Sequence, residues 1–419
     1  MAIWDGKLFF ISGAGLSGRA ALKAIKKNGG KAKIYSDVGG EFTAPPERDY
    51  FGAVISPGIK PAHPVYKYCI EHGITAMSEV DIGFSLVSAR KTVGITGTNG
   101  KTTTTRLVAD MLGGVACGNI GYPVSTAALK AGGPIVCELS SFQLHTARIS
   151  PDVAVITNIA SDHVDWHGGL DDYYKSKCNV ANNMTDGFLV LGEDISLAAL
   201  DGLNTGARIV RCSTHGICDG AYTHDGYFMF EGKRVCPIDY LRLPGAHNIK
   251  NALCAIAAAK CLGASNTAVL SALSTAELSP HRVQRIGVFG GKTWVDDSKG
   301  TNVSACLAAI SETSGNVCLI LGGRGKDTDF AELFTCLDGR VTEIIAMGET
   351  AQDIRNSCAE HTPTLKITVV NGLKDAVRVA AKSDAPTVLL SPACASFDEF
   401  DSYAQRGERF KAEVQALYR

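Results

Sequence analysis

The sequence predicts an α/β protein of three domains, in which helices cover mainly parallel sheets. Short apolar runs typical of buried strands alternate with helical stretches along the 419 residues. Two glycine-rich loops, at 12–18 and 94–101, each follow an apolar run and precede a helical pattern. A helix that begins in this way presents its N-terminus to phosphate. The chain is also too long for one core of usual size, so several domains are expected.

Composition and charge describe an ordinary globular protein, 45% hydrophobic and 20% charged. With 41 basic and 42 acidic residues, the chain has no strong overall field that would attract nucleic acid or an anionic membrane. The first residues lack the pattern of an export signal, and no segment approaches about 18 continuous apolar residues. We therefore expect a cytoplasmic protein without nucleic-acid or membrane partners.

The 14 cysteines lie mostly within apolar runs, and no Cys-x-x-Cys pair occurs. Reduced, buried thiols are favoured over a zinc site or a disulfide framework.

A new strand pattern begins near residue 90 and a helical region ends near residue 279, so we place the domain boundaries there. They give a Rossmann-like domain over 1–90, a central phosphate-loop ATPase-like domain over 91–278 and a second Rossmann-like domain over 279–419. Turn signals and short alternating runs predict a small antiparallel insertion over 220–243. The Ala- and Leu-rich stretch that follows predicts a helix that Gly263 ends.

The first glycine loop has Gly13, Gly15 and Gly18 in the spacing of a dinucleotide-binding turn. Its glycines let the backbone approach a diphosphate at the start of a helix. Asp37, about twenty residues further on, would accept the ribose hydroxyls in an NAD-binding protein. These residues alone leave NAD and another nucleoside diphosphate open.

The second loop, GITGTNGKTTTT over 94–105, suits the phosphates of ATP. Gly97 and Gly100 expose backbone amides, Lys101 supplies charge and the Thr102 hydroxyl reaches Mg²⁺. The spacing departs from the usual pattern because Ile95 stands at the first glycine position. The alternative is a glycine-rich turn that binds nothing.

Acidic side chains at strand ends complete this site. Glu138 ends one apolar run, while Asp162 and His163 follow another. Because the carboxyl ends of parallel strands share one edge of a sheet, these groups are expected beside the phosphate loop, where Glu138 is the best ligand for Mg²⁺.

Eight segments resemble, in chain order, the landmarks of the Mur ligases. They are TGTNGKTT (96–103), ELSSFQL (138–144), TNIASDHVDWHGGLDDYYKSK (157–177), GAHNIKNALCA (245–255), PHRVQ (280–284), VDDSKGTN (295–302), LILGGRGK (319–326) and LLSPACASFDEFDSYAQRGERF (389–410). The resemblance spans nearly the whole chain and is weakest over 190–240. It implies ATP-driven amide formation through an acyl phosphate, with a first domain that holds the uridine diphosphate of a sugar substrate rather than NAD.

Within the family, the pattern is most similar to members that add D-glutamate to UDP-N-acetylmuramoyl-L-alanine in peptidoglycan precursor synthesis, and it implies a monomer. Three alternatives remain. One is another carboxylate–amine ligase of the superfamily, including one that glutamylates folate. The others are an NAD-dependent oxidoreductase and a nucleotide-dependent regulator without chemistry.

The resemblance also implies roles for single residues. The catalytic set is Lys101, Glu138, His163 and Lys177, and the metal set is Thr102, Glu138, His163 and a carbamylated Lys177. Contacts to ATP are implied for Gly97, Thr98, Asn99, Gly100, Lys101, Thr102, Thr103, Asn251, Arg282 and Asp297, with His247 and Asn248 near the metal and phosphates. Contacts to the UDP-sugar are implied for Leu16, Ser17, Asp37, Ser56, Gly58 and Asn119, and to the amino acid for Lys299, Thr301, Lys326, Ser396 and Phe397.

Structural alternatives exist for several of these residues. Asn248 could cap a helix, and Lys177 could be a solvated lysine on a helix. The sequence departs from the family pattern in two places. Val38 and Gly39 follow Asp37 where a Thr-Arg pair is common, and Phe397 and Tyr403 replace a Leu and a Phe. Arg406 and Arg409 are expected to be surface or salt-bridge residues of the last helix.

Overall fold

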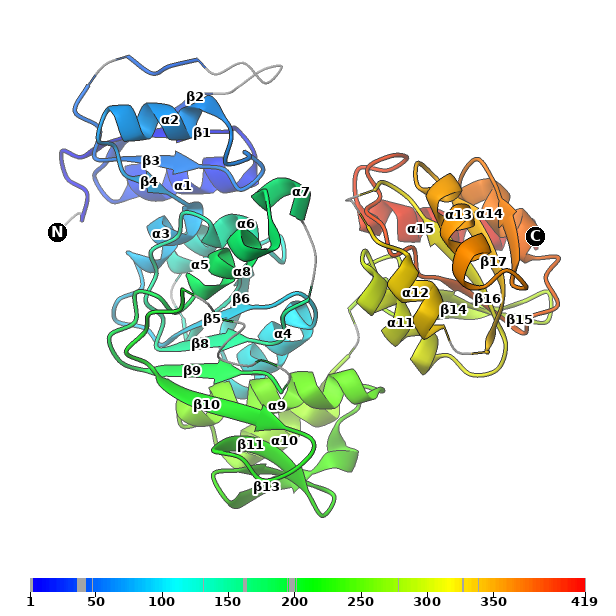
Figure 1. Ribbon diagram of the computed structural model, residues 1–419. Helices are drawn as coiled ribbons and strands as arrows, with labels where there is room; N and C mark the ends of the chain where they lie inside the picture. Colours follow the sequence, from blue (N-terminus) through cyan, green and yellow to red (C-terminus); the bar gives the residue numbers. More distant parts are fainter. Residues whose placement is uncertain are drawn as a thin grey trace. The chain divides into compact units, whose positions relative to one another are not determined.

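The computed structural model describes the chain except for residues 1–2, 36–42, 47, 131, 161–163, 194, 196–199, 201, 278, 326–327, 338 and 419. Three parallel-rich sheets with covering helices confirm the α/β class (Figure 1). The chain divides into two compact units, residues 1–276 and 277–419, so a unit ends close to the predicted boundary at 279. The first unit contains two of the sheets, and its division near residue 90 into separate domains stays a prediction.

The N-terminal sheet has the order β2-β1-β3-β4, with every pair parallel. Its strands are β1 (Leu8–Ser12), β2 (Lys31–Tyr35), β3 (Gly52–Ile55) and β4 (Ala76–Met77), and its helices are α1 (Leu16–Lys27), α2 (Pro64–Glu71) and α3 (Glu79–Phe84). Side chains alternate between the faces, so Phe9 and Ile11 belong to the core with α1 while Phe10 belongs to the core with α2. This pairing brings the start of α1 and the end of β3 to one edge of the sheet.

The central sheet has nine strands in the order β13-β12-β11-β10-β9-β8-β5-β7-β6. They are β5 (Thr92–Thr96), β6 (Val115–Gly118), β7 (Ile135–Glu138), β8 (Val153–Ile156), β9 (Phe188–Leu191), β10 (Arg208–Ser213), β11 (Gly220–His224), β12 (Tyr227–Phe230) and β13 (Lys233–Pro237). From β6 to β11 in this spatial order, which includes β5, all neighbouring strands are parallel. Strands β11, β12 and β13 pair antiparallel, which confirms the predicted insertion.

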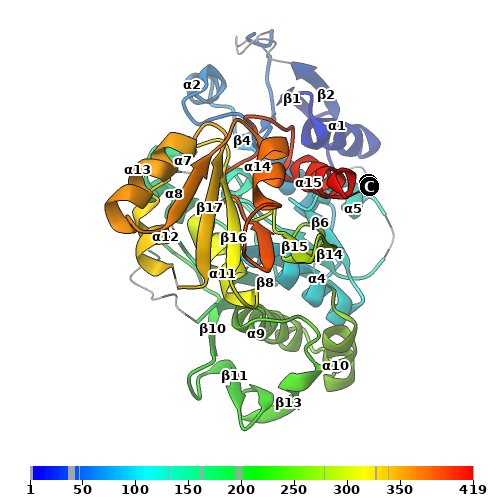
Figure 2. The same cartoon turned by 90° about the vertical axis from the view of Figure 1, so that its right-hand side faces the viewer.

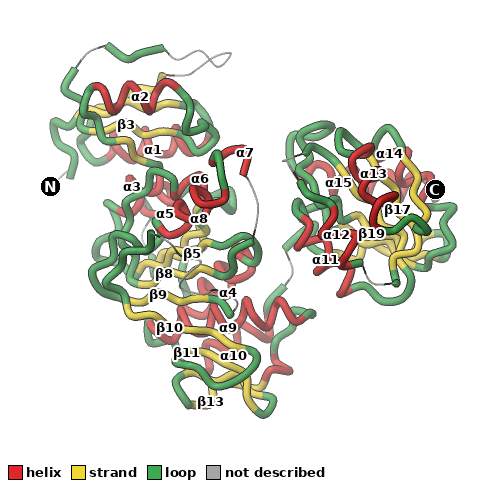
Figure 3. The backbone as a smooth tube through the Cα atoms, in the orientation of Figure 1, coloured by secondary structure: helices red, strands yellow, loops and turns green. Residues whose placement is uncertain are grey.

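Helices lie beside this sheet in Figure 3, with strands drawn in yellow and helices in red. They are α4 (Lys101–Leu112), α5 (Val124–Ala128), α6 (Ser141–Leu144), α7 (Val164–His167), α8 (Leu170–Cys178), α9 (Ala246–Cys261) and α10 (Asn266–Thr275), with a 3₁₀ turn at Ile238–Tyr240. Half of the residues that α9 buries are alanines, and α4 packs against this helix. The left-handed φ of Gly263 at 86° follows the end of α9, as the sequence predicts.

The second unit holds a sheet of order β14-β15-β19-β16-β17-β18, parallel except for the β14–β15 pair. The strands are β14 (Gln284–Phe289), β15 (Lys292–Asp296), β16 (Val317–Gly322), β17 (Val341–Met347), β18 (Lys366–Val369) and β19 (Thr387–Leu390). One core joins the sheet to α11 (Val303–Glu312), α12 (Ala331–Cys336) and α13 (Ala351–His361), and another joins it to α14 (Leu373–Ala380) and α15 (Tyr403–Leu417). Figure 2 shows α12 and α13 on one side of β16 and β17, and α14 and α15 on the other.

All 14 cysteines are described and free. Most are buried, which confirms the burial predicted from their apolar surroundings. Among the described residues, no helix combines the length and apolar character needed to cross a membrane.

Candidate active site

The phosphate loop connects the end of β5 to the start of α4. Gly100, the residue before α4, has a φ of 79° and, as a glycine, offers no side chain to cap the helix. A Cβ atom at Gly100 would collide with Oδ1 of Asn251, so both the conformation and the close approach of α9 require glycine there. The Lys101 Nζ donates to the carbonyl oxygens of Gly97 at 2.9 Å and Thr98 at 2.8 Å. The loop is thus a cationic turn at a helix N-terminus, the arrangement that suits phosphate.

Two residues after β8 hold this loop in shape. Thr157 Oγ1 donates to the Asn99 carbonyl at 2.6 Å, and Asn158 Nδ2 donates to the same oxygen at 2.9 Å. Asn158 Oδ1 in turn accepts from the Asn99 backbone amide at 2.9 Å. Sequence reasoning missed both residues, although a polar Thr-Asn pair directly after a buried parallel strand was a usable signal.

Glu138 is the last residue of β7 and lies opposite Gly118 of β6. Its side chain is 3% exposed, and Oε1 accepts from Asn119 Nδ2 at 2.8 Å. Its Oε2 is buried and has no hydrogen-bond partner among the residues that the structure describes. An uncompensated buried carboxylate oxygen is costly, and a hard divalent cation would satisfy it.

Lys177 comes to the same loop from α8. It is 1% exposed, and its Nζ donates to the Gly97 carbonyl at 2.8 Å. The Nζ also lies 4.4 Å from the ring centroid of Tyr173, whose hydroxyl is 3.1 Å from Thr98 Oγ1. The alternative of a solvated helix lysine is therefore wrong, because the fold of α8 directs this ammonium into the loop rather than into water.

The start of α9 supplies the predicted asparagines. Asn251 is buried, and its Nδ2 donates to Asn248 Oδ1 at 3.2 Å. Asn248 Nδ2 donates to the Pro244 carbonyl at 2.6 Å. The residue that caps α9 is Gly245, so the capping alternative for Asn248 is wrong. His247, in the first turn of this helix, is half-buried.

Most of the described residues predicted to bind the UDP-sugar lie at one edge of the N-terminal sheet. Leu16 and Ser17 begin α1, whereas Ser56 and Gly58 follow β3 at the same edge of the N-terminal sheet. Leu16 is largely exposed, and Ser56 Oγ donates to the Gly13 carbonyl at 3.4 Å. Asn119 lies apart from them, on the central sheet beside Glu138.

The second unit carries another group of predicted contacts. Asp297 is buried and accepts from Ser391 Oγ at 2.7 Å, while Arg282 Nη1 lies 3.6 Å from its other oxygen. Burial raises the pKa of Asp297 to about 6. Lys299 Nζ lies 5.7 Å from the ring centroid of Tyr403. Thr301 is half-buried, Ser396 is buried and Phe397 is 61% exposed.

The expectation that Arg406 is a surface residue is wrong. Its side chain is buried, and the guanidinium donates to the carbonyls of Ser298, Cys394 and Ala395 and to Ser298 Oγ, at 2.9–3.1 Å. These four hydrogen bonds compensate the buried charge. Arg409 does form a surface ion pair, with Glu413 at 2.6 Å.

Four predicted site residues lie outside the described residues. They are Asp37, Asp162, His163 and Lys326.

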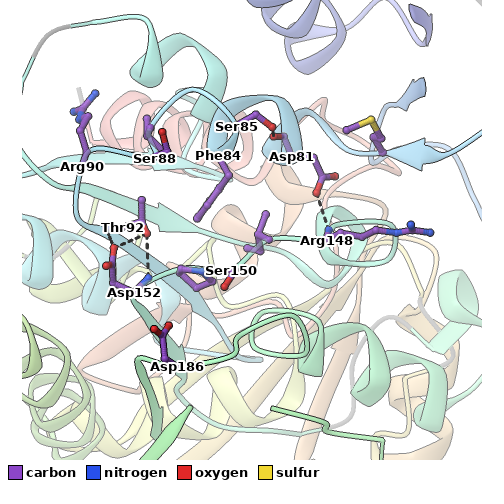
Figure 4. Close-up of a pocket in the computed structure, with 14 residues that line it drawn as sticks. Asp81, Phe84, Ser85, Ser88, Arg90, Thr92, Arg148, Ser150, Asp152 and Asp186 are labelled. Atoms are coloured by element: carbon purple, nitrogen blue, oxygen red, sulfur yellow. Dashed lines mark hydrogen bonds between the residues drawn. The ribbon is translucent and has the colours of Figure 1, made fainter. Parts of the chain in front are cut away.

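A cavity of about 480 Å³ lies at the opposite edge of the central sheet (Figure 4). Thr92, the first residue of β5, and Asp152, just before β8, line it. The Asp152 carboxylate accepts from the Thr92 amide and hydroxyl, and the Asp81 carboxylate accepts from the Arg148 amide. The carboxylates of Asp81 and Asp152 are thus already hydrogen-bonded, and the full length of β5 separates the cavity from the phosphate loop.

The fold and the loop together define a nucleotide-binding protein of the phosphate-loop class, with a buried carboxylate suited to a divalent ion. Comparisons with known proteins agree with this class. Residues 95–259 match the Mur ligase middle domain, and residues 281–394 match the Mur ligase, glutamate ligase domain.

Curated relatives resemble the chain over most of its length. A protein of Streptococcus equi subsp. zooepidemicus, named UDP-N-acetylmuramoylalanine--D-glutamate ligase, is 38% identical over 88% of this chain and 84% of its own length. A protein of the same name from Latilactobacillus sakei subsp. sakei is 34% identical and covers 100% of this chain and 99% of its own. This chain belongs to the Mur ligase family.

Solved structures share the fold at low sequence identity. MurF from Acinetobacter baumannii has a TM-score of 0.63 at 16% identity, covering 99% of this chain and 91% of that one. The UDP-N-acetylmuramate-alanine ligase of Thermotoga maritima has a TM-score of 0.62 at 18% identity, covering 98% and 99%. A Mycobacterium tuberculosis folylpolyglutamate synthase solved with ADP and AMPPCP has a TM-score of 0.59 at 16% identity, covering 80% and 92%.

Proposed function

We propose that this chain joins D-glutamate to UDP-N-acetylmuramoyl-L-alanine by ATP-driven amide formation, in peptidoglycan precursor synthesis. The observation that carries the chemistry is the meeting of the phosphate loop, two lysines and the unsatisfied Glu138 oxygen at one edge of the central sheet. Two relatives named for this activity match the chain over most of their own length, and they support the choice of substrates. Cytoplasmic location and a monomeric state are part of the proposal and rest on the sequence alone.

The reaction needs a cationic site, since the substrate carboxylate must approach a triphosphate. The carboxylate attacks the γ-phosphorus, ADP leaves, and the acyl phosphate formed is opened by the amine of D-glutamate with release of phosphate. Lys101, which donates to two loop carbonyls, would turn to the phosphates when nucleotide binds. Electrostatic stabilisation by such fixed groups accounts for most of the catalysis of phosphoryl transfer.

Magnesium fits the oxygen donors at this edge. Glu138 offers a buried carboxylate oxygen without a hydrogen-bond partner among the described residues, and Thr102 offers a hydroxyl in the first turn of α4. His163 completes the proposed set with Lys177. When bound, Mg²⁺ would neutralise the charge that develops on the phosphoryl oxygens.

We propose that Lys177 is carbamylated in the active enzyme. As an ammonium, it donates to the same Gly97 oxygen as Lys101, so two like charges lie within two hydrogen-bond lengths of each other. Like charges at this distance in a buried site disfavour each other. Loss of a proton gives the neutral Lys177 amine, whose nitrogen adds to CO₂ and releases a second proton. The carbamate formed reverses the sign of the charge and would supply oxygen ligands.

The remaining predicted contacts complete the proposal. Asn251 would contact adenine, Arg282 the phosphates and Asp297 the ribose. On the amino-acid side, Lys299, Thr301, Lys326, Ser396 and Phe397 would bind the acyl-phosphate end and D-glutamate, whose two carboxylates suit cations, hydroxyls and backbone donors. Leu16, Ser17, Asp37, Ser56, Gly58 and Asn119 would bind the UDP-sugar.

A phosphate-release assay tests the function directly. With ATP, Mg²⁺ and UDP-N-acetylmuramoyl-L-alanine, we expect release that depends on D-glutamate and not on L-alanine, meso-diaminopimelate or L-glutamate. Dependence on another amino acid would assign a different ligase of the family. Binding of NADH in preference to the UDP-sugar, followed by NADH fluorescence, would support the oxidoreductase alternative.

A further inference from the structure

His167 lies between the two segments that carry Glu138 and Lys177. It is the last residue of α7 and is buried. Its Nε2 is 3.0 Å from the hydroxyl of Ser141, three residues after Glu138, and its Nδ1 is 3.4 Å from the hydroxyl of Ser176, which directly precedes Lys177. Each ring nitrogen thus bonds to a different segment, so the imidazole connects them.

Aromatic packing fixes the orientation of this ring. The His167 centroid is 4.5 Å from that of Trp166 and 5.7 Å from that of Phe142, with the Phe142 ring stacked at 24°. The His167 centroid is also 5.4 Å from that of Tyr173. Tyr173 lies under the Lys177 ammonium and is bonded to Thr98 of the phosphate loop. Movement of His167 would therefore disturb α6, α8 and the loop together.

A neutral imidazole suits this position. With Lys177 as an ammonium, burial is the largest of the causes that lower the pKa of His167 to about 4. A neutral ring has one N–H donor and one acceptor nitrogen, and each serine hydroxyl can take the complementary part. Removal of either serine would leave a buried ring nitrogen without its partner.

From these contacts we infer that His167 is a positioning residue that sets the separation between Glu138 and Lys177. The inference rests on the proposed function, in which these two residues are ligands of the metal site. His167 does not itself contact substrate or metal. It acts on the site in the way that outer-shell hydrogen bonds orient ligands, whose loss typically costs about 10–100-fold in metal affinity.

The test is a titration of the full-length protein with Mn²⁺ in the presence of a non-hydrolysable ATP analogue, followed by electron paramagnetic resonance. The variant His167→Phe keeps an aromatic ring in the cluster and removes both hydrogen bonds, while Ser176→Ala removes only the link to α8. We expect His167→Phe to weaken Mn²⁺ binding about tenfold or more, and Ser176→Ala to weaken it by a smaller factor.

His145→Phe is the matched control. His145 belongs to the same aromatic cluster, with its ring 5.5 Å from Trp166 and 6.3 Å from His167, but it does not link the Glu138 and Lys177 segments through the bonds described. It should bind Mn²⁺ like the wild type. The melting temperature of each variant shows whether the fold is retained.

Three outcomes are decisive. Weaker Mn²⁺ binding by His167→Phe, with binding by His145→Phe unchanged, supports the inference. Equal Mn²⁺ binding by His167→Phe and the wild type overturns it, as do equal losses in the two histidine variants. Failure of the proposed function is recognised separately, because the wild type would then release no phosphate with D-glutamate. The Mn²⁺ titration does not depend on the amino acid, so it reports on His167 in either case.

Discussion

Lys101 and Lys177 donate to the same atom, the carbonyl oxygen of Gly97, at 2.9 and 2.8 Å. One lysine begins the helix after the phosphate loop, and the other arrives from α8, 76 residues later in the chain. The loop carbonyl thus gathers two cations where a triphosphate is proposed to bind. In the proposed function Lys101 is kept as an ammonium and Lys177 is converted to a carbamate, so the two lysines lead to separate predictions.

Lys101→Ala should lower the rate of D-glutamate-dependent phosphate release by about 10²–10³-fold, as for the removal of other preorganised electrostatic groups. Arg106→Ala is the control, since Arg106 lies exposed on the same helix. Near-normal turnover of the Lys101 variant would remove this lysine from the mechanism.

Lys177→Ala should lose activity that added short-chain carboxylates partly restore, because a free carboxylate can occupy the space and charge of the lost carbamate. Steady-state phosphate release with and without acetate or formate measures this. Lys175→Ala, which alters an exposed lysine of the same helix, should be active and insensitive to these anions. A Lys177 variant that showed neither a defect nor rescue would argue against carbamylation.

The Asn119–Glu138 hydrogen bond couples the proposed sugar contact to the proposed metal ligand, at 2.8 Å. Asn119→Ala should therefore raise both the KM for the UDP-sugar and the Mg²⁺ concentration that gives half-maximal rate. The loss of one hydrogen bond to a charged group corresponds to about a tenfold change. If only the KM changed, Asn119 would serve the sugar without affecting Glu138.

Asp297 gives a prediction for stability against pH. Its pKa of about 6 in the folded chain exceeds the ordinary value of about 3.9, so between these values the folded state binds a proton that the unfolded state has released. The stability that protonation supplies is therefore complete below about pH 4 and is lost as the pH rises to about 6.

Asp297→Asn removes this titration. Relative to the wild type, its melting temperature should rise between about pH 4 and pH 6 and stay level above, while its affinity for ATP falls. Tryptophan fluorescence, to which Trp294 of the same unit contributes, follows unfolding. A difference in melting temperature from the wild type that did not change with pH would contradict the assignment.

Local patterns predicted the parts of the site that depend on neighbours in the chain. The glycine loops, the antiparallel insertion and Glu138 at a strand end follow from spacing and periodicity. The burial of Arg406 could not be predicted in this way, because two of its four hydrogen bonds go to Ser298, which is 108 residues away. The proposed role of Lys177 was implied only by the resemblance to the Mur ligases. A lysine in a polar helical segment does not by itself indicate that its side chain is buried.

The most direct test of the central claim uses UDP-N-acetylmuramoyl-L-alanine with heavy oxygen in its terminal carboxylate. If that carboxylate attacks ATP, its oxygen becomes the bridge of the acyl phosphate and leaves with the phosphate when nitrogen attacks the carbonyl carbon. Mass spectrometry should find one labelled oxygen in each phosphate released. Phosphate without label, formed together with the amide product, would contradict the account.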